Sequence, residues 1–255
     1  MSTAKQSFKA RNHERIKSKE YTKTYLNRKR ERQEEPNNYP ITRMILIKDF
    51  FRTPDLYKAI AFFLGVQIVI ATISSSVDNT KYAGALNLLA LIMGGVAVVL
   101  AIMTINKRQR LDPTRRRFRF SRVLLIVTVM LIALFIVTFI FNKLGITMTS
   151  QPNQMSLETL LSQFPISMLF TMIIVSPIVE EVVFRELLPY ATGPSYFSFI
   201  LSSLIFIALH APFGLMGWTS YAILAAGFLY ARLKDNNVYT GIAVHMIWNA
   251  LSVII

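Results

Sequence analysis

The stretch FPISMLFTMIIVSPIVEEVVFRELLPY, residues 164–190, decides the fold class because it joins a long apolar run to a dense group of charges. A helix needs roughly 20 mostly apolar residues to cross a hydrocarbon core of about 30 Å. The first half of this stretch has no charged residue, whereas Glu180, Glu181, Arg185 and Glu186 crowd the second half. Charges inside a membrane span are costly, so these side chains are candidates for function.

The rest of the chain extends the membrane pattern. Of the 255 residues, 53% are hydrophobic and 16% are charged, which is more apolar than is usual for a soluble domain. The sequence therefore predicts an all-α fold, a polytopic transmembrane helical bundle of about seven spans with a cytoplasmic N-terminus. The expected spans are about 57–77, 84–105, 123–141, 157–188, 195–210, 218–233 and 240–255.

Basic residues set the expected orientation and the expected partners. Residues 1–56 contain 14 Lys and Arg, and the loop 107–122 contains another 8. Such blocks beside apolar spans are typical of cytoplasmic segments that attract anionic lipid headgroups. The net charge of +14 is spread over a tail and a loop without a recognisable nucleic-acid-binding fold, so no nucleic acid is expected as a partner.

Three regions follow from these patterns. Residues 1–56 are expected to form a basic cytoplasmic arm and a membrane-surface segment, and residues 57–141 the N-terminal transmembrane spans. The remaining spans, within residues 155–255, form the third region. No apolar region follows the N-terminus closely enough to form a secretory signal peptide. We therefore expect a multi-pass protein of a cell membrane, and a bacterial plasma membrane in particular.

The charges of the central stretch differ in their expected partners. Glu181 and Arg185 lie four residues apart, on one helical face, and are expected to pair. Glu180 is rotated about 100° from Glu181, so it is expected to point to a different neighbour. Glu186 is expected near the interface, where its carboxylate would reach headgroup water.

Later spans contribute further polar residues. His245 and Asn249 are four residues apart, and a count of 1.5 Å per residue places Glu180 and His245 at a similar depth, about 8–13 Å inside the cytoplasmic boundary. By the same count His210 lies roughly 20 Å from Ser195. Either the helix that carries His210 is tilted or starts deeper, or His210 is not part of the site.

A carboxylate beside imidazoles can activate water. The carboxylate takes the proton, and imidazole or amide donors stabilise the oxyanion, so the pattern predicts peptide-bond hydrolysis without an acyl-enzyme. A GxSxG elbow is absent, which disfavours serine chemistry. Two histidines and one glutamate are also the ligands of several catalytic zinc sites, so zinc stays an alternative, although no HExxH motif is present. The chain has no cysteine, which excludes disulfides and thiolate chemistry.

The polar residues also form three ordered motifs. They are EExxxR at Glu180, Glu181 and Arg185, FxxxH at residues 206–210, and HxxxN at residues 245–249. With these motifs, residues 155–255 resemble the CPBP family of intramembrane proteases, which includes the CAAX prenyl endopeptidases and the bacterial Abi proteins. One departure is that Glu186 stands where the family often has glycine.

The resemblance implies a role for each motif residue. Glu180 would be the general base and His210 would assist it, while His245 and Asn249 would form the oxyanion site. Glu181 and Arg185 would support these four. The family is usually described as metal-independent glutamic proteases, so no cofactor is implied.

The expected function is therefore an intramembrane endopeptidase that cleaves peptide or membrane-protein substrates. Bacterial relatives are linked to bacteriocin self-immunity, so a non-catalytic immunity or binding protein is the alternative. A transporter is less favoured, because no inverted repeat is found.

Overall fold

The computed structural model describes residues 50–109, 116–146 and 152–254, and these residues form helices and connecting turns without a β-strand. The all-α expectation is confirmed. Residues 1–49 of the predicted basic arm and residues 110–115 of the predicted basic loop lie outside the described part.

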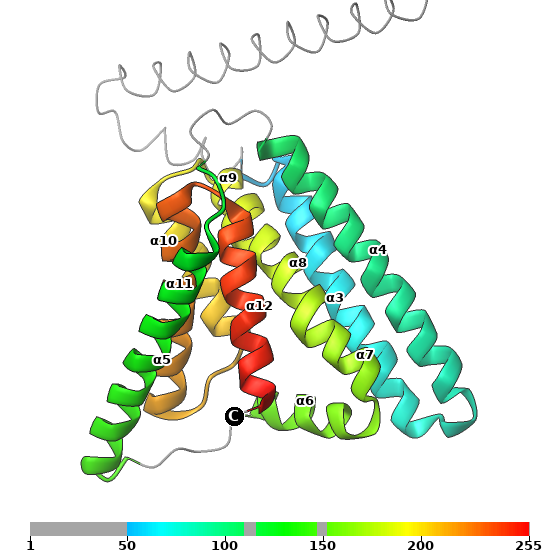
Figure 1. Cartoon of the computed structure of the whole chain (residues 1–255). Helices are drawn as coiled ribbons and strands as arrows, with labels where there is room; N and C mark the ends of the chain where they lie inside the picture. The colour runs from blue at the N-terminus through cyan, green and yellow to red at the C-terminus, as the bar shows by residue number, and fades with distance from the viewer. Residues whose placement is uncertain (1–49, 110–115, 147–151, 255) are drawn as a thin grey trace, which may run out of the picture.

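The N-terminal spans form a helical hairpin followed by a single helix. Helices α3 (Pro54–Asp78) and α4 (Ala83–Gln109) lie side by side, joined through the short 3₁₀ turn η1 (Thr80–Tyr82), and α5 (Phe120–Lys143) follows (Figure 1). Pro54 begins α3, where its missing N–H costs nothing and its fixed φ suits the first turn. These helices lie where the apolar spans 57–77, 84–105 and 123–141 were predicted.

The fourth span begins later than predicted. The expected single span 157–188 is divided at Phe164, and the preceding helix α6 (Pro152–Gln163) lies crosswise at one end of the bundle (Figure 1). Pro165 explains the break, because a proline disfavours helical backbone in the residue before it; Phe164 has φ −131° and ψ 64°. The span itself comprises α7 (Pro165–Phe170), η2 (Thr171–Val175), α8 (Ser176–Val182), η3 (Val183–Leu187) and α9 (Leu188–Ala191).

Three more helices complete the bundle: α10 (Tyr196–Leu209), α11 (Gly214–Asp235) and α12 (Val238–Ile254). Ser195 caps α10 by accepting the Ser198 N–H at 3.1 Å. Asn236 ends α11 in the left-handed conformation, with φ 46°. The turn between α11 and α12 is therefore short, and it packs the two helices against each other.

The helices are those of a multi-pass membrane protein. Within the described residues, five helical segments are long and apolar enough to cross a membrane, and α10 and α12 are apolar but shorter. The count of seven spans therefore stays a prediction. The segment Pro165–Ala191 is the central one: 61% of its most apolar window is buried, against 22% for each of α3, α4 and α5.

Candidate active site

Two widened turns frame the acidic pair. The π-helical turns η2 and η3 stand directly before and after α8, the short helix that carries Glu180 and Glu181. Turns of this kind occur often at functional sites. In each, a backbone carbonyl is bonded by a side chain of another helix: Met172 O accepts from Asn249 Nδ2 at 2.8 Å, and Phe184 O accepts from Ser202 Oγ at 2.7 Å.

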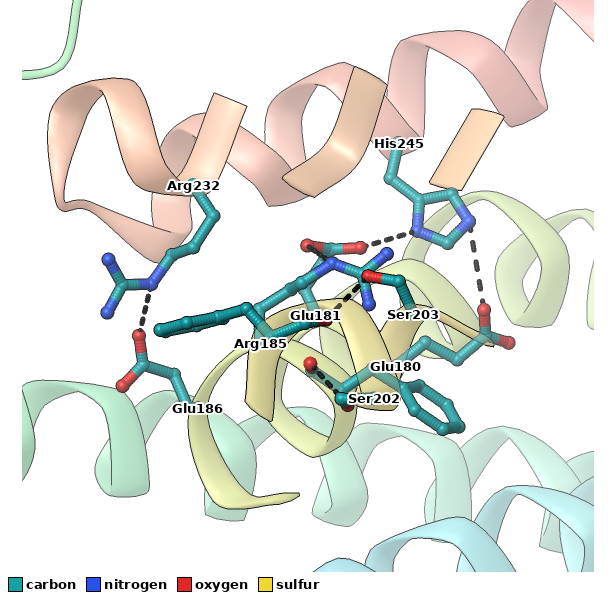
Figure 2. Close-up of polar contacts among 10 residues, drawn as sticks. Glu180, Glu181, Arg185, Glu186, Ser202, Ser203, Arg232 and His245 are labelled. Carbon is teal, nitrogen blue, oxygen red and sulfur yellow. Dashed lines mark hydrogen bonds and ion pairs between the residues drawn. The ribbon is translucent and has the colours of Figure 1, made fainter. Parts of the chain in front are cut away.

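His245 lies between the two adjacent glutamates (Figure 2). Its Nδ1 is 3.3 Å from Glu181 Oε1, and its Nε2 is 3.7 Å from Glu180 Oε2. As expected, Glu180 points to a different neighbour from Arg185, the predicted partner of Glu181, but the same imidazole also offers its other nitrogen to Glu181. The predicted common depth of Glu180 and His245 is confirmed.

Glu181 and Arg185 form the predicted pair behind this contact. Arg185 Nε is 3.8 Å from Glu181 Oε2, and both side chains are fully buried. The guanidinium also lies over the Phe206 ring, 5.2 Å from its centroid, and none of its nitrogens has a hydrogen-bond partner among the described residues. The pair therefore places one negative and one positive charge in the interior, which keeps the net charge of this part of the interior low.

Exposure separates the two carboxylates. The Glu180 side chain is 20% exposed, whereas that of Glu181 is 0% exposed. A water molecule can reach part of the Glu180 side chain without displacing a packed side chain, and it cannot reach Glu181 in this way. Glu180 is therefore the carboxylate suited to act on a substrate, and Glu181 is suited to hold His245.

Aromatic rings fix the orientation of His245. The Phe228 ring of α11 stacks on the imidazole, with centroids 4.1 Å apart and planes 16° apart. Phe206 of α10 meets it edge-on, with centroids 6.1 Å apart. The imidazole is thus confined between apolar faces, and its two nitrogens point along the remaining directions, toward the glutamates.

His210 lies beside the site. Its ring packs on Phe206, with centroids 4.3 Å apart, so Phe206 contacts both histidines. The hydrogen bond from Ser202 to Phe184 sets the register of α10 against the antiparallel central span. This register brings Phe206 level with Glu180. His210 then lies about one helical turn, roughly 6 Å, beyond that level. Whether His210 takes part in the site therefore stays a prediction.

The hydrogen bond of His210 defines its tautomer. Its Nδ1 is 2.7 Å from the carbonyl oxygen of Phe206, and a carbonyl can only accept, so Nδ1 carries a proton. In the neutral imidazole, Nε2 is then an acceptor. His210 can therefore accept a hydrogen bond from water or from a substrate N–H.

Asn249 has one contact that the sequence did not predict. Its Nδ2 donates to Met172 O in the π turn η2, which ties α12 to the central span. An amide nitrogen has two hydrogens, so the second one remains for another acceptor. Asn249 thus positions α12 whatever else it binds.

The comparisons with known proteins agree with this geometry. Residues 162–251 match a family model described as type II CAAX prenyl endopeptidase Rce1-like. The CPBP resemblance is confirmed. All six predicted site residues, Glu180, Glu181, Arg185, His210, His245 and Asn249, lie inside this Rce1-like segment, and the α3–α4 hairpin and α5 lie outside it.

A curated relative is similar over a comparable length. The UPF0177 protein YvdC of Lactococcus lactis subsp. lactis is 28% identical over 124 residues, which is 47% of this chain and 47% of the relative. The match thus spans about half the length of either protein. No solved structure matches the chain significantly.

The Rce1-like segment also contains buried charges that the sequence analysis placed elsewhere. Glu186 is 2% exposed, and its Oε1 accepts from Arg232 Nε at 2.6 Å; the expectation that it reaches headgroup water is wrong. Arg232 lies in the last turn of α11 and is 3% exposed. The sequence did not predict this pair, because Glu186 and Arg232 are 46 residues apart along the chain and meet only where the end of α11 lies near η3.

The arrangement of the possible ligands bears on the zinc alternative. Among the described residues, no group of three or more His, Asp or Glu side chains is close enough together to hold a metal ion. The three ligands of the zinc alternative would be two histidines on different helices and one glutamate. In the structure the ring of His210 packs on Phe206, and its Nδ1 is hydrogen-bonded to the carbonyl oxygen of Phe206.

Two further residues shape the site without belonging to a motif. Phe228 stacks on His245, and Gly241 brings α12 so close to α8 that a Cβ atom at this position would lie 2.8 Å from Glu181 Oε2. No sequence pattern marked Phe228, because an aromatic residue in an apolar helix is ordinary.

Proposed function

We propose that the protein is an intramembrane endopeptidase in which Glu180 activates the attacking water. The family match supports a protease in general terms. The observation that supports the role of Glu180 is the difference in exposure between the two glutamates. Glu180 is open to small molecules, and His245 lies beside it, while Glu181 and Arg185 are sealed behind.

The proposed reaction needs one base and a pair of donors. Glu180 takes a proton from water as the oxygen attacks the scissile carbonyl, and the tetrahedral intermediate bears an oxyanion. The proposed donors to that oxyanion are the second Nδ2 hydrogen of Asn249 and the Nε2–H of His245 in its doubly protonated form, whose Nδ1–H stays on Glu181. Glu180 then returns the proton to the leaving amine as the C–N bond breaks, so the atoms and charges balance without an acyl-enzyme.

His210 is proposed to orient the water. With Nδ1 bonded to the Phe206 carbonyl, its Nε2 is an acceptor on the side away from its own helix backbone. In the proposed reaction, Nε2 of His210 accepts a hydrogen bond from one hydrogen of the water while Glu180 removes the other. The proposed substrate is a peptide or a membrane-protein segment, and the proposed location is a bacterial plasma membrane.

Glu180→Gln tests the proposal, because it keeps the shape of the side chain and removes the base. Membranes containing wild type, Glu180→Gln or the control Glu158→Gln, an exposed position on α6, are compared by quantitative proteomics and peptidomics. We expect cleavage products with wild type and with the control, and a loss of about 10²–10⁴-fold in their rate of formation with Glu180→Gln. Unchanged products with Glu180→Gln would refute the role of Glu180.

The same preparations distinguish the alternatives. Metal analysis of the purified chain, together with inactivation by a chelator and recovery with zinc, would replace the glutamate mechanism with a zinc mechanism. An immunity phenotype that survives Glu180→Gln would support the non-catalytic alternative.

A further inference from the structure

A group of four arginines stands at the start of α5, outside the Rce1-like segment. Arg116, Arg117, Arg119 and Arg122 line a hollow of about 310 Å³. The start of α5 lies at the end of the bundle where α11 ends and α12 begins (Figure 1). The proposed protease chemistry does not use these residues, and four guanidinium groups around one hollow suit an anion.

The backbone around the hollow is held in place. Arg116 N donates to the Asp235 carbonyl at 2.9 Å, and Asn237 Nδ2 donates to the Arg116 carbonyl at 3.1 Å. Arg122 also forms an ion pair with the Asp235 carboxylate. Asp235 and Asn237 are fully buried, so the first and last arginines are fixed to the turn between α11 and α12 rather than carried by a loose loop.

The charges of the group are only partly neutralised within the described structure. The buried Asp235 carboxylate accepts Thr240 Oγ1 at 3.0 Å in addition to pairing with Arg122. Arg116, Arg117 and Arg119 are exposed. Like charges this close together repel one another, and a bound anion with several oxygen acceptors relieves the repulsion through bidentate hydrogen bonds.

The surface next to the arginines is apolar, which points to an amphiphile rather than a free ion. Large exposed apolar side chains continue from the hollow onto the outer face of α5. A headgroup on the arginines would place its acyl chains along this face. The residues, with their exposed fractions, are Phe118 (46%), Phe120 (57%), Leu124 (46%) and Leu125 (63%).

We propose that the hollow of Arg116, Arg117, Arg119 and Arg122 binds the phosphate-bearing headgroup of an anionic phospholipid. The four arginines of the hollow bind the phosphate, and the adjoining apolar face of α5 contacts the acyl chains. Through Asp235 and Asn237 the same contacts hold the first turn of α12, where Thr240 lies five residues before His245. Occupancy therefore stabilises the bundle at the end nearest the site, independently of whether the site is catalytic.

The test uses the purified full chain in a neutral detergent. Phosphatidylglycerol, phosphatidylcholine or inorganic phosphate is added, and the thermal midpoint and the lipid retained in native mass spectrometry are measured. We expect phosphatidylglycerol to raise the midpoint by about 4 °C, as a ligand specific to the folded state does, and to be retained. Phosphatidylcholine should do neither.

Two variants with the same loss of charge make the test specific. Arg117→Gln/Arg119→Gln spares the structural contacts of Arg116 and Arg122, and Lys58→Gln/Lys107→Gln removes two exposed charges from the same end of the bundle. The arginine variant should lose the shift and the retained lipid, and the lysine variant should keep both. Equal losses in the two variants, or a response that does not distinguish the two lipids, would overturn the proposal. A full shift with inorganic phosphate alone would also overturn it, in favour of a free-phosphate site.

Discussion

Neighbouring residues of the same type take different roles in this protein because of their surroundings. Glu180 and Glu181 both contact His245, but Glu180 is open on one side, and Glu181 is enclosed by Arg185, His245 and Gly241. The enclosure depends on the absence of a side chain at position 241. A carboxylate fixed on several sides holds the imidazole in one orientation, as a supporting group should.

Gly241→Ala should damage the site more than the fold. The new Cβ would stand 2.8 Å from Glu181 Oε2, so the carboxylate must move and His245 loses its support. We expect the rate of proteolysis to fall at least about tenfold, which corresponds to ~1.4 kcal/mol of transition-state stabilisation. The control is Gly95→Ala, because a Cβ there meets nothing within 4 Å. Equal activities in the two variants would show that Glu181 does not need this placement.

At the level of elements, the central span is held by side chains that bond its widened turns. Ser202 of α10 donates to Phe184 O in η3, and Asn249 of α12 donates to Met172 O in η2. Water is scarce at these depths, so a backbone carbonyl needs a protein donor. The two bonds fix the height of α10 and α12 relative to α8, and with it the height of both histidines relative to Glu180.

Ser202→Ala should therefore destabilise the bundle. It leaves the buried carbonyl of Phe184 without its donor, which costs about 1–3 kcal/mol. A lowered midpoint in thermal unfolding of the purified protein would confirm the loss. Ser75→Ala serves as the control, since Ser75 Oγ bonds only to the carbonyl of Ala71 one turn back in its own helix and is exposed. A midpoint shift no larger than that of the control would contradict the proposed role of Ser202.

The whole molecule has the surface of a membrane protein. Large apolar side chains such as Phe135 (73% exposed) and Leu125 (63% exposed) face outward, whereas Arg185, Glu181 and Asp235 are fully buried. A surface of this kind is stable only in contact with lipid. The start of α5, which carries the four arginines, lies at one end of the bundle, and α6 lies at the other (Figure 1).

The sidedness of the bundle is measurable because the chain has no cysteine. Lys81→Cys, in the turn between α3 and α4, and Lys234→Cys, near the end of α11, are predicted to lie on opposite sides of the membrane. In sealed right-side-out vesicles, a membrane-impermeant maleimide should label the cysteine at position 81 at once and the one at 234 only after the membrane is permeabilised. Labelling of both positions before permeabilisation, or the reverse order, would overturn the predicted orientation.

The sequence by itself determined the class of fold and singled out the polar residues that meet in the structure, Glu180, Glu181, Arg185 and His245. Apolar runs of membrane length dictate helices, and the spacing of four residues dictates that Glu181 meets Arg185 on one face. The equal depth of Glu180 and His245 also followed from the rise of a helix. These properties depend on local geometry, which the order of residues fixes directly.

Only the tertiary structure decided how separate helices meet. It placed His245 between two glutamates, brought His210 beside the site through the register of α10, and paired Glu186 with Arg232 across 46 residues of chain. It also divided the predicted fourth span at Pro165. Such contacts depend on the π turns, on the close approach at Gly241 and on the packing of several helices at once, and no local pattern in the sequence encodes them.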